Sequence, residues 1–138
     1  MGITNQILQD SRWRTIIKTD ITSTNASPLD ILDVSDIDGA GTACLGWVAG
    51  SVTNLTSISW SVTSGVEIAW AGTGGVTIVY FAGNGRYGGS DGFPAIPNPT
   101  TGGSDQGDVT LSNAAACKGY VVCVFHKVLA SDGSGWSG

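Results

Sequence analysis

The chain has 138 residues, the size of a single domain, and a net charge of −5. Only 12% of its residues are charged, against about 25% in an ordinary soluble domain, and Gly, Ser and Thr replace the missing Lys and Glu. Six basic residues without a basic cluster argue against nucleic acid as a partner. A membrane is not expected as a partner either, because no apolar run approaches the ~20 residues that a span needs.

Residues 1–11 are predicted to form an N-terminal arm. Ile3, Ile7 and Leu8 are spaced so that they allow one short helical turn. Two alternatives stay open, a frayed terminus and a segment that lies against a neighbouring subunit. The arm lacks the basic and long apolar regions of a signal peptide, so we expect none.

Residues 12–129 are predicted to form one β-domain, because apolar and polar side chains alternate in period two. The alternation changes face near Ile31, where we expect a β-bulge. Thr63-Ser64-Gly65 is predicted to be a hairpin turn, and a second turn is expected at residues 72–75. About eight short strands follow from this pattern, in residues 13–20, 27–37, 43–50, 57–62, 66–70, 74–83, 107–113 and 118–128.

The last of these strands is largely apolar on both faces, so we expect it to lie centrally in its sheet. Strong helix formers are scarce, while Thr, Val, Ile and Trp, which suit a pleated surface, are plentiful. The predicted fold is therefore all-β, an antiparallel β-sandwich of jelly-roll-like or immunoglobulin-like type. Residues 130–138 are predicted to be a flexible Gly/Ser-rich tail.

A glycine-rich segment after residue 82 has the form of a dinucleotide-binding loop, with Gly83, Gly85 and Gly88 in G-x-G-x-x-G spacing. Such a loop must open a helix, whose N-terminus supplies the amide donors. Three prolines between residues 94 and 99 exclude a helix here, so nucleotide binding is not expected. We predict a docking loop instead, bent by glycine at one end and stiffened by proline at the other.

No metal, cofactor or catalytic site is predicted. The acidic segment from Asp30 to Asp38 is not an EF-hand, because Val34 and Leu45 occupy ligand positions; an irregular calcium site and a solvated acidic edge are the two alternatives. His126 is the only histidine, and we expect Cys123 to point to the opposite face of the same strand. The chain is therefore expected not to be an enzyme.

The three cysteines, Cys44, Cys117 and Cys123, allow at most one disulfide, and we expect reduced thiols.

Four ordered segments carry a resemblance to a known family. They are ISWSVTSGVEIAWAG (58–72), VTIVYFAGNGRYG (76–88), IPNP (96–99) and GDVTLSNAAACKGYVVCVFHKV (107–128). From Trp13 to Lys127 the chain resembles small structural proteins of tailed-bacteriophage virions, notably capsid decoration (cement) proteins. It departs from their pattern in a longer Gly/Ser-rich loop and in the tail after Lys127.

The resemblance implies a β-sandwich that binds the major capsid protein on the outer surface of the virion, often as a homotrimer at a threefold axis, and that is made in the host cytoplasm. It implies no cofactor. Under this reading the arm and the docking loop supply the capsid or subunit contacts, which would be Ile3, Ile7, Leu8, Arg86, Tyr87, Phe93 and Ile96. The alternative is a tail, baseplate or head-fibre component that recognises host-surface glycans.

Overall fold

The structure is a computed structural model that describes residues 2–10, 14–33, 52–72, 74–88, 93–99 and 108–128. The described residues form seven strands and no helix, and every strand pairing is antiparallel. The predicted all-β antiparallel fold is therefore confirmed. The strands are β1 (Ile3–Asp10), β2 (Arg14–Ile21), β3 (Asn25–Leu32), β4 (Val52–Trp70), β5 (Thr77–Gly88), β6 (Val109–Asn113) and β7 (Gly119–Val128).

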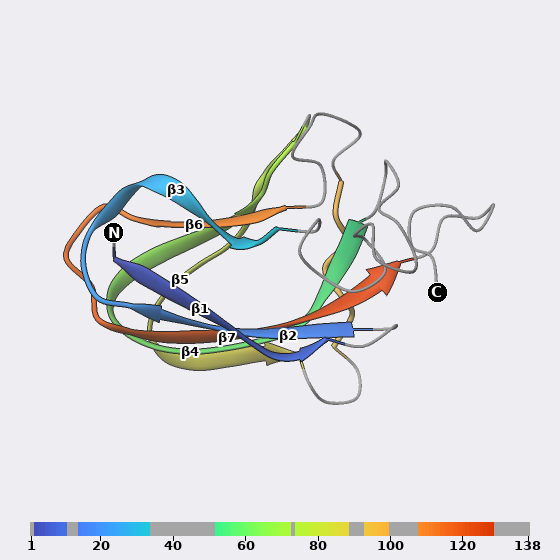
Figure 1. Cartoon of the computed structure of the whole chain (residues 1–138), viewed down its shortest axis with the longest axis horizontal. Helices are drawn as coiled ribbons and strands as arrows, with labels where there is room; N and C mark the ends of the chain where they lie inside the picture. Colours follow the sequence, from blue (N-terminus) through green and yellow to red (C-terminus); the bar gives the residue numbers. More distant parts are fainter. Residues whose placement is uncertain are drawn as a thin grey trace.

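The sheet has the strand order β1-β2-β7-β4-β6-β3, and β5 pairs with the opposite side of β4. The first part of β4, up to Val62, pairs with β7, and its last residues, Glu67–Trp70, pair with β6. This change of partner curls the sheet into a nearly closed barrel (Figure 1). At the seam of the barrel, Nδ2 of Asn5 in β1 donates a hydrogen bond to the carbonyl of Asp30 in β3, over 2.9 Å.

The predicted hairpin turn at Thr63-Ser64-Gly65 is wrong, because these residues lie inside the 19-residue strand β4. The ladder with β5 shifts register between Val62 and Val66, so the strand bends there without reversing. The bend is held by the loop before β7. The Thr63 amide donates to the Lys118 carbonyl (3.0 Å), and the Ser64 hydroxyl donates to the Ala116 carbonyl (2.7 Å). The second predicted turn is confirmed, since the amide of Gly75 donates to the carbonyl of Gly72.

The predicted helical turn in residues 1–11 is also wrong, because Ile3–Asp10 forms the edge strand β1. The start of β1 is fixed by two contacts of Gly2. Its carbonyl accepts a hydrogen bond from the Thr22 amide (2.7 Å), and its amide donates to Oδ1 of the buried Asn25 (3.1 Å). The segment is thus bound into the sheet and does not form a free arm.

The glycines of the expected docking loop lie in strand β5, which continues through Gly83 and Gly85 to Gly88. Gly83 and Gly88 adopt positive φ angles, of 67° and 78°. The glycines therefore bend a strand, whereas the sequence predicted that they bend a loop. Arg86 and Tyr87 are therefore strand residues, and only the segment beyond Gly88 can be a loop.

The core lies between the two halves of the curled sheet, and β7 is central, as predicted, between β2 and β4. The predicted alternation of β2 is confirmed, with Thr15, Ile17 and Thr19 buried. The β-bulge expected near Ile31 is present as a register shift between Asp30 and Leu32. The largest fully buried side chains include Ile21, Leu32, Leu55, Ile58, Ile68, Leu111 and Phe125.

Several predictions lie outside the described residues. They are the strand at 43–50, the tail at 130–138, and the positions of Asp36, Asp38 and Cys44.

Candidate functional site

Tyr87 and Phe93, two of the predicted contact residues, lie together at the end of β5. Their ring centroids are 5.3 Å apart and the rings are nearly perpendicular, at 80°. The Tyr87 hydroxyl also donates a hydrogen bond to the Pro94 carbonyl, over 2.7 Å. Phe93 keeps 53% of its surface exposed, and the neighbouring Arg86 is exposed as well. Arg86 precedes Tyr87 in strand β5, so its side chain points to the opposite face of the sheet. We call the other two residues, Tyr87 and Phe93, the aromatic corner.

Ile96 has a different role from the one predicted. Its amide donates to the Leu55 carbonyl (2.8 Å), and its carbonyl accepts from the Leu55 amide (2.9 Å). This antiparallel bridge places residue 96 on the side of β4 that β5 occupies farther along. The side chain is half-buried and packs against the core. Ile96 therefore holds the proline-rich segment in place, and its backbone and most of its side chain are not free to contact a partner.

The three apolar residues predicted to make contacts in the N-terminal segment differ in exposure. Ile3 is half-buried against the core, whereas Ile7 and Leu8 are 48% and 49% exposed. Leu8 is the extra residue of a bulge, since Ile7 pairs with Ile17 and Gln9 pairs with Ile16. Ile7 and Leu8 are thus available for contacts, and Ile3 contributes mainly to stability.

The predicted contact residues form two separate areas. β1 and β5 lie at opposite edges of the strand order β1-β2-β7-β4-β5. The exposed β1 residues and the aromatic corner therefore cannot contact the same small ligand. A partner that binds both must be as wide as the sheet, or there must be two partners.

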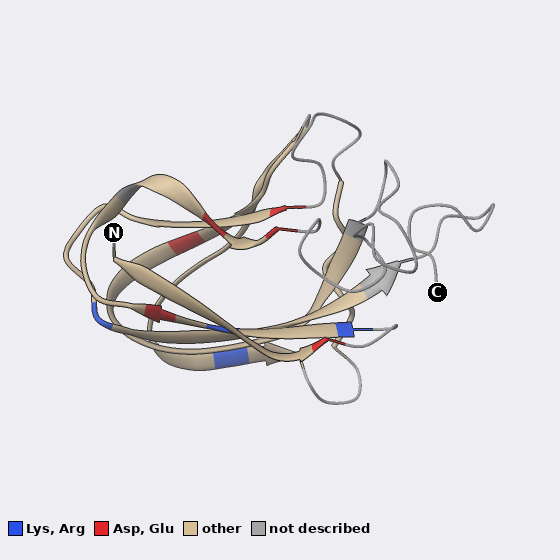
Figure 2. Ribbon diagram, viewed as in Figure 1, with Lys and Arg blue, Asp and Glu red and all other residues tan. Residues whose placement is uncertain are grey.

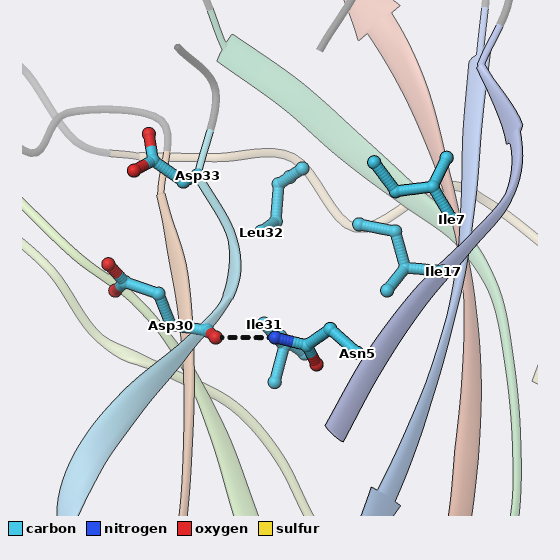
Figure 3. A pocket seen from close by; sticks show the side chains of 7 residues that line it. All are labelled: Asn5, Ile7, Ile17, Asp30, Ile31, Leu32 and Asp33. Atoms are coloured by element: carbon cyan, nitrogen blue, oxygen red, sulfur yellow. Dashed lines mark hydrogen bonds between the residues drawn. The ribbon is translucent and has the colours of Figure 1, made fainter. Parts of the chain in front are cut away.

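A pocket of about 220 Å³ lies at the seam between β1, β2 and β3 (Figure 3). Ile7, Ile17 and Leu32 line it with aliphatic carbon, and the Asn5–Asp30 hydrogen bond crosses it. The carboxylates of Asp30 and Asp33 point away from Ile7 and Ile17 in this view. The pocket therefore combines aliphatic walls with the polar groups of the Asn5 amide and the Asp30 carbonyl.

Those two carboxylates instead gather with that of Asp108, just before β6. One oxygen of each of the three side chains lies within 4.8 Å of the others. Figure 2 shows acidic segments at the end of β3 and the start of β6 facing each other. The prediction from the sequence located the acidic segment at residues 30–38 and did not include Asp108. Each of the three makes further interactions within the chain, and an acidic group of this kind is common without a metal ion.

A polar row that the sequence reasoning missed crosses the other half of the sheet. Tyr80, Glu67 and Ser112 are direct neighbours on β5, β4 and β6. The Tyr80 hydroxyl donates to Oε1 of Glu67 (3.0 Å), and the Thr77 hydroxyl donates to Oε2. Tyr80 is 71% exposed, and the hydrogen bond and negative charge of Glu67 raise the pKa of its phenol. Tyr80 alternates with the buried Phe81 along the strand, and this alternation could have predicted from the sequence that Tyr80 is exposed.

His126 and Cys123 lie on opposite faces of β7, as predicted. His126 is exposed and Cys123 is buried. Burial raises the pKa of the Cys123 thiol to about 12, so the thiol is neutral at physiological pH. The two side chains are therefore not arranged as a nucleophile and its base. Within the described residues no helix is long and apolar enough to cross a membrane.

Comparisons with known proteins add no relative to this description. No family model, no curated protein and no solved structure matches the chain.

Proposed function

We propose that the protein is a non-enzymatic virion protein that binds the outer surface of a bacteriophage capsid and stabilises it. Its partner is the major capsid protein, and its assembled form is a homotrimer. The resemblance of residues 58–72, 76–88, 96–99 and 107–128 to capsid decoration proteins is the basis for naming this partner.

The structural observation that carries the proposal is the aromatic corner. Aromatic and arginine side chains supply much of the binding energy in protein–protein interfaces. Here the Phe93 ring is exposed yet packs nearly perpendicular to the ring of Tyr87, whose hydroxyl donates a hydrogen bond to the Pro94 carbonyl. The bridge between Leu55 and Ile96 fixes the far end of the same segment. Little conformational entropy remains to be lost on binding, so the corner suits a rigid contact with a folded partner.

A protein of this kind stabilises a shell by mass action. Binding to the assembled capsid and not to its separate subunits favours assembly by RT ln(1 + [L]/Kd) per site. In a trimer the three aromatic corners bind one capsid surface together, so a modest affinity of each corner becomes a high avidity.

The test uses capsids from which the protein has been removed. Purified protein should bind them and raise the temperature or pressure at which they release DNA. Phe93→Ala should weaken binding by roughly tenfold or more, as expected for a central aromatic contact. Tyr80→Ala, which removes another exposed ring at a distance from the aromatic corner, is the matched control and should bind normally. A wild-type protein that does not bind capsids would refute the proposal.

A second function is favoured by the same exposed ring, because aromatic faces also stack against sugars. In that case the protein recognises host-surface glycans from the tail, baseplate or head fibre. A glycan array would then show a hit that Phe93→Ala abolishes, while stripped capsids would show no binding.

A further inference from the structure

A second pocket, of about 300 Å³, lies on the outer face of the sheet around the polar row of β5, β4 and β6. Tyr80, Glu67 and Ser112 contribute to its lining and are direct neighbours in the strand ladders. Glu67 and Ser112 alternate along their strands with the buried Ile68 and Leu111. The pocket therefore faces solvent and not the core.

The hydroxyl groups beside Glu67 already donate their protons to its carboxylate. The Tyr80 hydroxyl donates to Oε1 over 3.0 Å, and the Thr77 hydroxyl donates to Oε2. Asn113, which also lines the pocket, donates its side-chain amide protons to two main-chain carbonyls. Apart from the Ser112 hydroxyl, the described polar side chains of the pocket thus offer a ligand oxygen acceptors and no spare donors. A ligand that only donates fits this set better than a sugar or an anion.

The charge of the pocket also favours a donor that is cationic. Glu67 is half-buried, and no lysine or arginine among the described residues forms an ion pair with it. Lys118 lies nearby through its carbonyl, which accepts from the Thr63 amide, but its exposed side chain makes no such pair. A half-buried carboxylate without a cation gains energy when a cation binds beside it.

We propose that this pocket binds an arginine side chain of a partner protein. A guanidinium group is planar and has only donors, so two of its N–H groups can bond in parallel to the two oxygens of Glu67. Its plane can also stack on the Tyr80 ring, which the hydrogen bond to Glu67 holds beside the carboxylate before the ligand arrives. Lysine supplies the charge but neither the parallel hydrogen bonds nor the flat face. The pocket lies apart from the aromatic corner, so the inference does not depend on capsid binding.

The first experiment titrates the full chain with a short blocked peptide, acetyl-Gly-Arg-Gly-amide, and follows the main-chain amide resonances by NMR. We expect saturable shifts at the pocket, with a dissociation constant of roughly 1 mM. The same peptide with citrulline keeps the shape of arginine but loses its charge, and should bind about tenfold more weakly. Shifts that do not saturate with the arginine peptide, or equal binding of the citrulline peptide, would overturn the proposal.

A pair of variants tests whether Glu67 holds the peptide. Glu67→Gln keeps the size of the side chain and removes its charge, and should weaken binding of the arginine peptide about tenfold. Asp20→Asn is the matched control, because it changes the net charge equally at a carboxylate that is paired with Lys18 instead. It should bind the peptide normally, and the spectra of both variants report whether they are folded. Equal weakening in the two variants would refute a specific site, as would a sugar that binds the pocket of Glu67→Gln.

The Tyr80 phenol gives an independent measurement of where the peptide binds. Glu67 raises the pKa of this phenol, and a guanidinium bound between them offsets that negative charge and stabilises the phenolate. Saturating arginine peptide should therefore lower the pKa of Tyr80 in an ultraviolet titration, whereas the citrulline peptide should leave it unchanged. If the arginine peptide binds without changing this pKa, it binds elsewhere and the assignment is wrong.

Discussion

The main chains of Leu55 and Ile96 exchange two hydrogen bonds, of 2.8 and 2.9 Å, and this single bridge attaches the proline-rich segment to β4. Leu55 is fully buried and also pairs with Phe125 on its other side. The segment that carries Phe93 is consequently attached to the centre of the core.

We expect Ile96→Pro to destabilise the protein by about 1–3 kcal/mol, because it removes the amide that bonds to the Leu55 carbonyl and leaves that buried acceptor without its partner. Ala95→Pro is the control, since alternation directs the main-chain groups of residue 95 away from β4 and Ala95 is exposed. Urea denaturation measures both. Equal losses in the two variants would show that the bridge does not stabilise the fold.

Position 88 requires glycine for two reasons: the main chain of β4 approaches it closely, and its φ angle is positive. A Cβ atom there would lie 2.1 Å from the Thr56 carbonyl oxygen, and φ is +78°. We expect Gly88→Ala to cost roughly 2–4 kcal/mol. At Gly65 a Cβ meets nothing within 4 Å, so Gly65→Ala should be neutral or slightly stabilising. Thermal unfolding of the pair provides the comparison, and similar melting temperatures would contradict it.

The Tyr80 phenol should have a pKa above the ordinary value for tyrosine, because Glu67 accepts a hydrogen bond from its protonated form and repels the phenolate. In Glu67→Gln the pKa of Tyr80 should fall towards its ordinary value. Ultraviolet titration near the tyrosinate band follows the change, and Tyr80→Phe identifies the transition. A titration curve that Glu67→Gln leaves unchanged would argue against the hydrogen bond in solution.

Stability should decline in alkali because of Cys123. The unfolded thiol ionises from about pH 8.5, whereas the folded thiol stays protonated until its pKa of about 12. Between these values the unfolded state binds fewer protons, so the free energy of unfolding falls as pH rises, by up to about 1.4 kcal/mol per pH unit. The stabilisation is complete below the unfolded pKa. Denaturation of the wild type and of Cys123→Ala from pH 7 to 11 should show a shallower decline in the variant.

Features that depend on local alternation could be predicted from the sequence. The buried face of β2 and the bulge near Ile31 follow from the order of apolar and polar residues. The positive φ of Gly83 was also foreseeable, because glycine adopts such angles readily. Local composition did not reveal that the bend at Gly83 lies inside a strand. The parts of that strand on both sides of the bend stay paired.

Features that depend on distant partners could not be predicted. Thr63-Ser64-Gly65 has the composition of a turn, but its amide and hydroxyl groups bond to Lys118 and Ala116, more than fifty positions away. For the same reason, the spacing of apolar residues in Ile3–Asp10 indicated a helical turn, whereas in the fold this segment is a strand because it pairs with β2. Of the candidate site, exposure of Phe93 followed from its loop, whereas its support by Tyr87 and the anchoring role of Ile96 required the fold.

The pairing of β2 with β7 also sets the stage of synthesis at which the sheet can fold. Ile21 lies opposite Gly119, so β2 has no partner besides β1 until β7 has left the ribosome. The sheet should therefore begin to fold only after β7 has been made, and β1 and β2 stay unprotected until then. Sheets joined by contacts so distant in sequence fold slowly. Chaperone capture of ribosome-bound chains is thus a specific expectation for this topology.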